Sequence, residues 1–166
     1  MNLYLIRHGE AVRVGGAITR DADRFLTPRG EEDARRAGKA LTRIDGSVRL
    51  VMTSPLLRAI QTGRLVGTAF TTALPVEPSE RLVPGFRHKA LLEELAVRTG
   101  EESVVIVAHQ PDLTQFISWL IADSASASIG MAPGAVAHVT IAPPVSSGEA
   151  TLRWLLTPEI IQTLVP

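Results

Sequence analysis

The run Val104-Val105-Ile106-Val107 most constrains how this chain of 166 residues can fold. β-branched side chains favour extended backbone. A run that is apolar at every position also has no side that can face water, which is typical of a central strand in a parallel sheet covered by helices. The sequence therefore predicts an α/β protein with this strand near the middle of the sheet.

The rest of the chain alternates strands with helices in the same way. Short apolar runs predict strands at residues 3–6, 50–52 and 74–76, and two further strands at 135–141 and 151–156. Helices are expected from Pro28 to about residue 43, with Thr27 as N-cap, and from Ser54-Pro55 to about residue 69, with Ser54 as N-cap. Two more are expected over 89–99 and after Pro111-Asp112. This order predicts one domain, residues 1–166, with a mostly parallel sheet and an antiparallel addition at its end.

Composition excludes several classes of protein. The chain has 17 basic and 17 acidic residues, which argues against a nucleic-acid binder. It has no cysteine, so cysteine nucleophiles, thiolate metal sites and disulfides are impossible. No metal-ligand spacing and no P-loop are present, so neither a metal nor another cofactor is expected. No signal peptide or membrane-spanning run is visible either, and we expect a cytoplasmic protein.

Three predicted strands end in residues that suit an anion site. Arg7 and His8 follow the first strand, Arg58 lies just after the second, and His109 follows the 104–107 run. The carboxyl ends of parallel strands meet at one edge of a sheet, where ligands bind. Helix starts at Ser54-Pro55 and Gln110-Pro111 add N–H donors there, so Ser54 and Gln110 are candidate substrate-binding residues. Guanidinium groups suit a phosphoryl group, and a neutral imidazole can attack phosphorus.

Four blocks resemble the histidine phosphatase (phosphoglycerate mutase-like) superfamily. They are RHGE at 7–10, LTPRG at 26–30, TSPLLRAIQT at 53–62 and VIVAH at 105–109. The whole chain is similar to the small bacterial SixA-type branch of phosphohistidine phosphatases, including the region of Trp154 and Thr157-Pro158. The resemblance implies a three-layer α/β/α sandwich. It also implies that His8 accepts the phosphoryl group and that Arg7, Arg58 and His109 bind it. Gly9 would let the loop pass close to the ligand, with its carbonyl orienting the ring of His8.

Departures from the family pattern bear on the substrate. Mutase-like members have Ser and Asn at the positions of Ala11 and Val14. Arg81 stands where many SixA-like chains carry an acidic residue, so the general acid is unassigned, and Glu80 beside it and Glu10 are the remaining candidates for a proton donor or loop orienter. The segment after the third strand is short, which predicts an open, shallow site suited to a phosphorylated protein.

These features predict a phosphatase that hydrolyses phosphohistidine on a signalling or phosphotransfer protein through a phospho-His8 intermediate. An imidazole leaving group needs less help from a general acid than an alkoxide does. Two alternatives remain open: a small-molecule phosphomonoesterase, and a protein that binds phosphorylated ligands without turnover. Phosphate-like anions are expected in the pocket, and neither a nucleic acid nor a membrane is an expected partner.

Overall fold

Six strands form a single sheet in the computed structural model, which describes residues 1–98, 102–142 and 144–165. The strands are β1 (Asn2–Arg7), β2 (Leu50–Thr53), β3 (Val76–Pro78), β4 (Ser103–Ala108), β5 (Val136–Thr140) and β6 (Thr151–Leu156). Their order is β3-β2-β4-β1-β5-β6. The first four strands are mutually parallel, β5 pairs antiparallel with β1, and β6 pairs antiparallel with β5. The predicted α/β architecture, with the apolar run of 104–107 inside the sheet, is confirmed.

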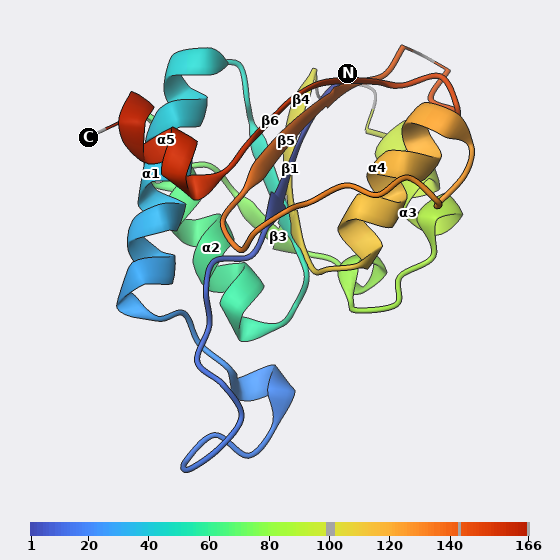
Figure 1. Cartoon of the computed structure of the whole chain (residues 1–166). Coiled ribbons are helices and arrows are strands. Elements are labelled where there is room, and N and C mark those ends of the chain that lie inside the picture. The colour runs from blue at the N-terminus through green and yellow to red at the C-terminus, as the bar shows by residue number, and fades with distance from the viewer. Residues whose placement is uncertain (99–101, 143, 166) are drawn as a thin grey trace.

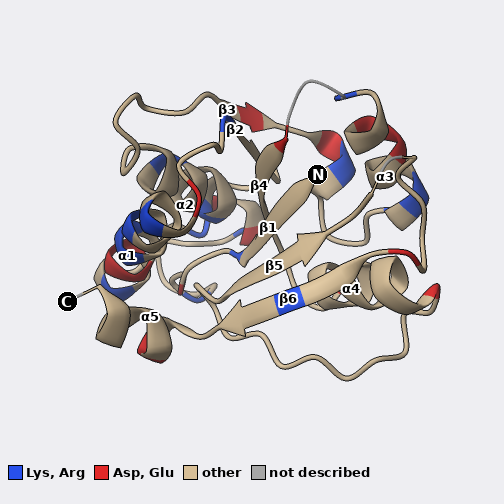
Figure 2. Ribbon diagram, turned by 90° about the horizontal axis from the view of Figure 1, so that it is seen from above, with Lys and Arg blue, Asp and Glu red and all other residues tan. Residues whose placement is uncertain are grey.

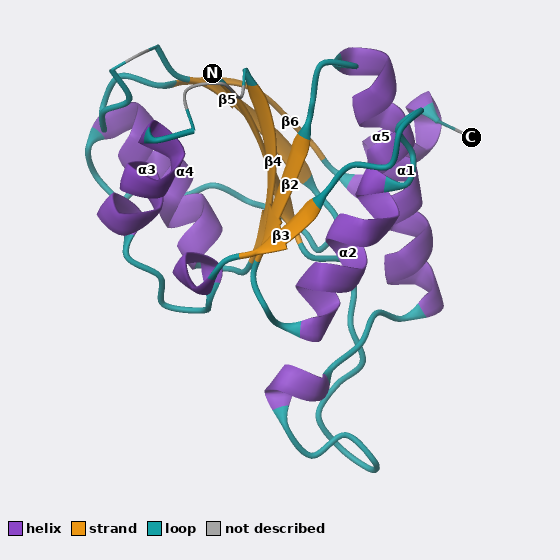
Figure 3. Ribbon diagram, turned by 180° about the vertical axis from the view of Figure 1, so that it is seen from behind, coloured by secondary structure: helices purple, strands orange, loops and turns teal. Residues whose placement is uncertain are grey.

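Helices cover both faces of this sheet. On one face lie α1 (Pro28–Ile44), α2 (Leu57–Gly67) and α5 (Pro158–Leu164), and on the other lie α3 (His88–Ala96) and α4 (Asp112–Ala122) (Figures 1 and 3). Two single-turn 3₁₀ helices, η1 (Asp21–Asp23) and η2 (Glu80–Leu82), lie in loops. The structure thus has the three layers that the family resemblance implies.

Side chains of the central strands alternate between two cores. Leu3 and Leu5 of β1 pack with the apolar sides of α3 and α4, whereas Tyr4 and Ile6 pack with α1, α2 and α5. β4 alternates in the same way, and every one of its residues is buried. Burial of both faces makes these strands rigid supports for the residues that follow them.

The predicted helix starts are only partly correct. Thr27 caps α1, with its hydroxyl accepting a hydrogen bond from the Gly30 N–H, as expected. The prediction that Ser54 caps the next helix is wrong, because α2 begins at Leu57. The Ser54 N–H still bonds to the Val107 carbonyl of β4, so the chain has not yet left the sheet at Ser54. Thr157, which also precedes a proline, caps α5. The sequence patterns did not predict this helix.

Two other boundaries also shift. β3 begins at Val76 rather than at residue 74, because the Leu74 N–H bonds back to Gly67 at the end of α2. α3 ends at Ala96, whereas the expected end at residue 99 lies outside the described residues. Neither shift changes the elements that carry the predicted site.

A long loop between β1 and α1 extends away from the body of the domain (Figure 1). Its base is held by a bridge between Ala11 and Leu26, and it contains η1. Charged residues gather on the helices, most visibly along α1, and β6 carries one basic position (Figure 2). Among the described helices, none has the length and apolar character needed to span a bilayer.

Candidate active site

Three segments that follow strands bring His8, Arg58 and His109 into contact. His8 comes directly after β1, His109 directly after β4, and Arg58 lies in the first turn of α2 behind β2. The imidazole rings of His8 and His109 lie 5.0 Å apart between centroids, and both residues are buried. The Arg58 guanidinium reaches both rings from α2. The sequence-predicted convergence at the carboxyl edge of the sheet is present.

Hydrogen bonds fix the tautomer of His8. Its Nδ1 lies 2.8 Å from the Gly9 carbonyl oxygen, which can only accept, so Nδ1 carries the proton. Nε2 accepts a hydrogen bond from Arg58 Nε at 3.2 Å and therefore holds a lone pair. Burial, reinforced by the charges of Arg58, Arg7 and Arg24, lowers the pKa of His8 to about 4. The ring is therefore neutral at pH 7, with its lone pair toward the arginines.

His109 is the opposite tautomer to His8, with its ring proton on Nε2. Arg58 Nη2 lies 3.4 Å from His109 Nδ1, and because a guanidinium can only donate, Nδ1 accepts. Burial, together with the charges of His8 and Arg58, lowers the pKa of His109 to about 3. A neutral ring whose Nδ1 accepts carries its proton on Nε2. That N–H is buried and has no hydrogen-bond partner within the described part of the chain, so it is a donor available to a ligand.

Arg7 and Gln110 share one carbonyl. Arg7 Nη1 donates to the Met131 oxygen at 2.8 Å, and Gln110 Nε2 donates to the same oxygen at 3.4 Å. The Gln110 side-chain oxygen accepts from the Thr114 hydroxyl, which fixes the amide. Arg7 Nε is buried and unpartnered among the described residues. Arg7 Nε–H is therefore still able to donate to a ligand, whereas the Gln110 amide is held by its hydrogen bonds to Met131 and Thr114.

Gly9 is required by packing against α1. A Cβ at this position would lie 2.7 Å from the Gly30 carbonyl oxygen, closer than side chains pack. The Gly9 N–H donates to the Thr62 hydroxyl at 3.0 Å, and that hydroxyl donates to the Arg58 carbonyl at 2.8 Å. The Gly9 carbonyl orients the His8 ring, as the resemblance implies. The close contact that leaves no room for a side chain at position 9 is with the Gly30 backbone.

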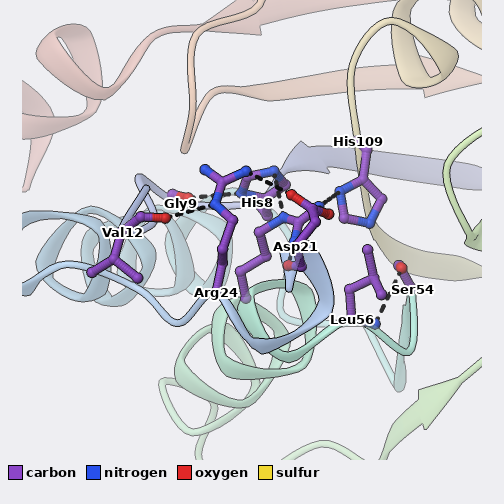
Figure 4. Close-up of polar contacts among 9 residues, drawn as sticks. His8, Gly9, Val12, Asp21, Arg24, Ser54, Leu56 and His109 are labelled. Carbon is purple, nitrogen blue, oxygen red and sulfur yellow. Dashed lines mark hydrogen bonds and ion pairs between the residues drawn. The ribbon is translucent and has the colours of Figure 1, made fainter. Parts of the chain in front are cut away.

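The remaining predicted residues lie outside this cluster of side chains. Ser54 is buried, and its hydroxyl accepts from the Leu56 N–H (Figure 4). A Glu10 carboxylate oxygen accepts from the Thr27 hydroxyl, which suits a loop orienter. Glu80 is exposed, with no side-chain hydrogen bond in the described structure. Arg81 turns toward α3, where it donates to the Ala90 carbonyl.

The sequence motifs did not predict two further residues of the site. Asp21 of η1 accepts hydrogen bonds from Arg58 and from Arg24. Asp21 and Arg24 lie beside His8 (Figure 4). The protruding loop therefore covers the cluster around His8, which is only 9% exposed, so the site is less open than the short segment after β3 suggests. Asp21 and Arg24 are separated from the motifs in sequence, and only the i,i+3 spacing of their opposite charges gives a weak signal.

Comparisons with known proteins identify a family and solved structures that this chain resembles. The family described as histidine phosphatase superfamily (branch 1) matches residues 3–83. The phosphohistidine phosphatase SixA of Escherichia coli strain K12 is 26% identical over 162 residues, which are 95% of this chain and 94% of SixA. A solved structure of the protein histidine phosphatase SixA complexed with tungstate superposes with a TM-score of 0.83 at 26% identity, over 95% of this chain and 97% of the other.

The same fold occurs in a phosphatase of a small molecule. The alpha-ribazole phosphatase of Shigella flexneri has a TM-score of 0.72 at 24% identity, over 95% of this chain and 97% of that one. This likeness concerns the fold alone. The two kinds of phosphatase named here have substrates of different classes, so the substrate must be argued from the site.

Proposed function

The chain belongs to the histidine phosphatase superfamily, and we propose that it removes the phosphoryl group from phosphohistidine on another protein. The observation that carries the proposal is the state of His8: a neutral ring held by Gly9, with the Nε2 lone pair against Arg58. An imidazole in this state is a nucleophile that needs no separate base.

The reaction has two displacements at phosphorus. In the first, the Nε2 lone pair of His8 forms a bond to phosphorus while the bond to the substrate imidazole breaks, and the leaving ring keeps the electron pair and takes a proton from water. In the second, a water oxygen bonds to phosphorus, the bond to His8 breaks with its electron pair returning to Nε2, and the protons of the water stay on the phosphate or pass to solvent. The products are inorganic phosphate, dephosphorylated protein and neutral His8.

Positive charge and N–H donors around His8 would stabilise the transferring group. The equatorial oxygens, whose negative charge grows in the transition state, would be bound by Arg58, Arg7 and the Nε2–H of His109, which has no partner among the described residues. Preorganised donors of this kind contribute roughly 10²–10³-fold each to rate. We infer that this charge replaces a metal ion in the mechanism.

The surroundings favour a leaving group that needs no proton donor. The position where an acid is expected holds Arg81, whose guanidinium is engaged by α3. Hydrogen bonds from Arg24 and Arg58 lower the pKa of Asp21, so this nearby carboxyl is deprotonated and cannot supply a proton at neutral pH. Imidazole leaves phosphorus readily, whereas an alkoxide needs the roughly 10²–10⁴-fold assistance of a general acid. These contacts support phosphohistidine over an alkyl phosphate.

The test compares two substrates at matched concentrations. The protein is incubated with a phosphohistidine-bearing protein and, in parallel, with an alkyl phosphate, and phosphate release is measured. His8→Ala removes the proposed nucleophile. His138→Gln is the control, because His138 lies on β5 and stacks on Tyr4, away from the cluster.

We expect faster release from phosphohistidine, abolished in His8→Ala and retained in His138→Gln. Comparable release from the alkyl phosphate would replace the proposal with the phosphomonoesterase alternative. Phosphate binding without release from either substrate would replace it with a binding role. Full activity in His8→Ala would overturn the assignment of the nucleophile.

A further inference from the structure

The anion site already contains an anion supplied by the chain itself. Asp21 Oδ2 accepts a hydrogen bond from Arg58 Nη2 at 2.9 Å, and Asp21 Oδ1 accepts from Arg24 Nη1 at 3.0 Å. The carboxylate thus bridges two guanidinium groups, that of Arg58 from α2 and that of Arg24 from the protruding loop. A phosphoryl group that binds Arg58 needs the same donors.

Arg58 is the fixed partner of this bridge, and Asp21 is the exposed one. The Arg58 side chain is 5% exposed, is anchored on α2 and contacts His8 and His109. The Asp21 side chain is 56% exposed and belongs to a three-residue 3₁₀ helix whose preceding residue makes no side-chain cap. A competing anion can therefore displace the Asp21 side chain more easily than the Arg58 side chain.

Arg24 lies close enough to act on both rings. Its charge contributes to the lowered pKa of His8 and of His109. Its Nε donates to the Val12 carbonyl at 2.6 Å, which holds the guanidinium over the site from the base of the loop. If the Asp21 carboxylate leaves, Arg24 retains this backbone anchor and has a free donor toward the site.

We propose that Asp21 is a displaceable counter-anion of the phosphoryl site and that Arg24 becomes a ligand of the substrate oxyanion when Asp21 is displaced. The inference rests on the proposed function, since it assigns two more residues to the same site. A tethered carboxylate competes as an intramolecular ligand, so an incoming anion must bind strongly enough to replace it. The dianionic phosphoryl group meets this requirement better than a monoanionic carboxylate does.

The test measures binding of inorganic phosphate to the full chain by titration calorimetry, without turnover. Asp21→Asn keeps an oxygen that can accept from Arg58 but removes the competing charge. Asp23→Asn is the matched control, because Asp23 lies in the same 3₁₀ helix and pairs only with the exposed Arg20 in the described contacts. Arg24→Gln is made both alone and in the Asp21→Asn background.

We expect Asp21→Asn to bind phosphate about tenfold more tightly, because phosphate no longer has to break the two ion pairs of Asp21. Asp23→Asn should bind within about twofold of the parent, and Arg24→Gln should weaken binding in both backgrounds.

Unchanged or weaker binding in Asp21→Asn would overturn the competition and make Asp21 a positioning residue for Arg58. Unchanged binding in Arg24→Gln would overturn the role of Arg24. These outcomes are separate from the failure of the proposed function, which would appear as phosphate binding without hydrolysis of phosphohistidine. Absence of phosphate binding in the parent and in every variant would overturn both proposals.

Discussion

Arg58 donates from Nε to the Nε2 of His8 at 3.2 Å, so the guanidinium rests against the lone pair that would attack phosphorus. The contact keeps the proton off Nε2, because a protonated nitrogen could not accept this bond. It also places the positive charge where the oxyanions of the proposed substrate would bind. In the proposed mechanism, one arginine thus links the protonation state of the nucleophile to the binding of its substrate.

Replacement of Arg58 by lysine tests this double role. Lysine keeps a positive charge but cannot direct separate, fixed donors to His8, His109 and Asp21. We expect turnover of phosphohistidine to fall by about 10²–10³-fold, the usual effect of losing a preorganised donor. Arg64→Lys is the control, because Arg64 is an exposed residue of the same helix. Equal turnover in both variants would show that charge alone suffices at position 58.

Thr62 is expected to be a positioning residue. Its hydroxyl accepts from the Gly9 N–H and donates to the Arg58 carbonyl, which joins the loop after β1 to α2. Thr62→Val leaves the buried Gly9 N–H without a partner, so we expect a loss of roughly 1–3 kcal/mol in the free energy of unfolding. We also expect a lower kcat for phosphohistidine.

Two variants separate this effect from simple packing. Thr62→Ser retains the hydroxyl and should restore most of the kcat, measured by phosphate release. Thr68→Val removes an exposed hydroxyl that bonds to Leu65 at the end of the same helix, and it should leave kcat unchanged. If the serine variant behaves like the valine variant, the methyl group matters and the hydroxyl bridge does not.

Gly9→Ala should damage both stability and activity. The added Cβ would lie 2.7 Å from the Gly30 oxygen, and backbone atoms on both sides must move to accept it. We expect a cost of about 1–3 kcal/mol in urea unfolding and a displaced His8 ring, with lower turnover. At Gly130 an added Cβ meets nothing within 4 Å, so Gly130→Ala should leave both quantities near those of the parent. A stable, active Gly9→Ala variant would contradict the packing argument.

The parts of the fold that local sequence determines were predictable. Val104 to Val107 identified an interior strand, and Thr27-Pro28 identified the start of α1, because apolar runs and capping residues act within a few positions. The start of α2 was misplaced because its position depends on the Ser54–Val107 hydrogen bond between distant strands. Sequence signals near Ser54 do not contain that contact.

The candidate site likewise combines features that the local sequence predicts with features that depend on contacts between distant segments. The topology of the sheet alone brings three site residues to one edge, because each of them follows the end of a parallel strand. These residues are His8, Arg58 and His109. Asp21 and Arg24 reach the site through a loop whose path depends on contacts with Val12 and Arg58. Loop geometry of this kind is set by tertiary contacts rather than by local propensity, so the covering of the site could not be predicted.

The two buried histidines should make stability depend on pH in a defined window. The pKa of His8 is lowered to about 4 and that of His109 to about 3, whereas both would titrate near 6.5 in the unfolded chain. The unfolded state therefore binds more protons as pH falls below 6.5, and stability is lost toward pH 4. Each histidine contributes at most about 3 kcal/mol to this loss between pH 6.5 and 4.5. Asp21 and Asp45, whose pKa values are lowered, lose their stabilising effect below about 3.8, outside this window.

Urea unfolding at pH 7.5 and pH 4.5 measures this loss. The parent protein should lose more free energy of unfolding between the two values than His8→Gln or His109→Gln, because each variant lacks one group that protonates only when unfolded. Saturating phosphate should reduce the loss, since a bound anion favours protonated rings. An identical loss in the parent and in both variants would mean that neither ring is held neutral in the folded protein, and the assignment of His8 as a neutral nucleophile would then fail.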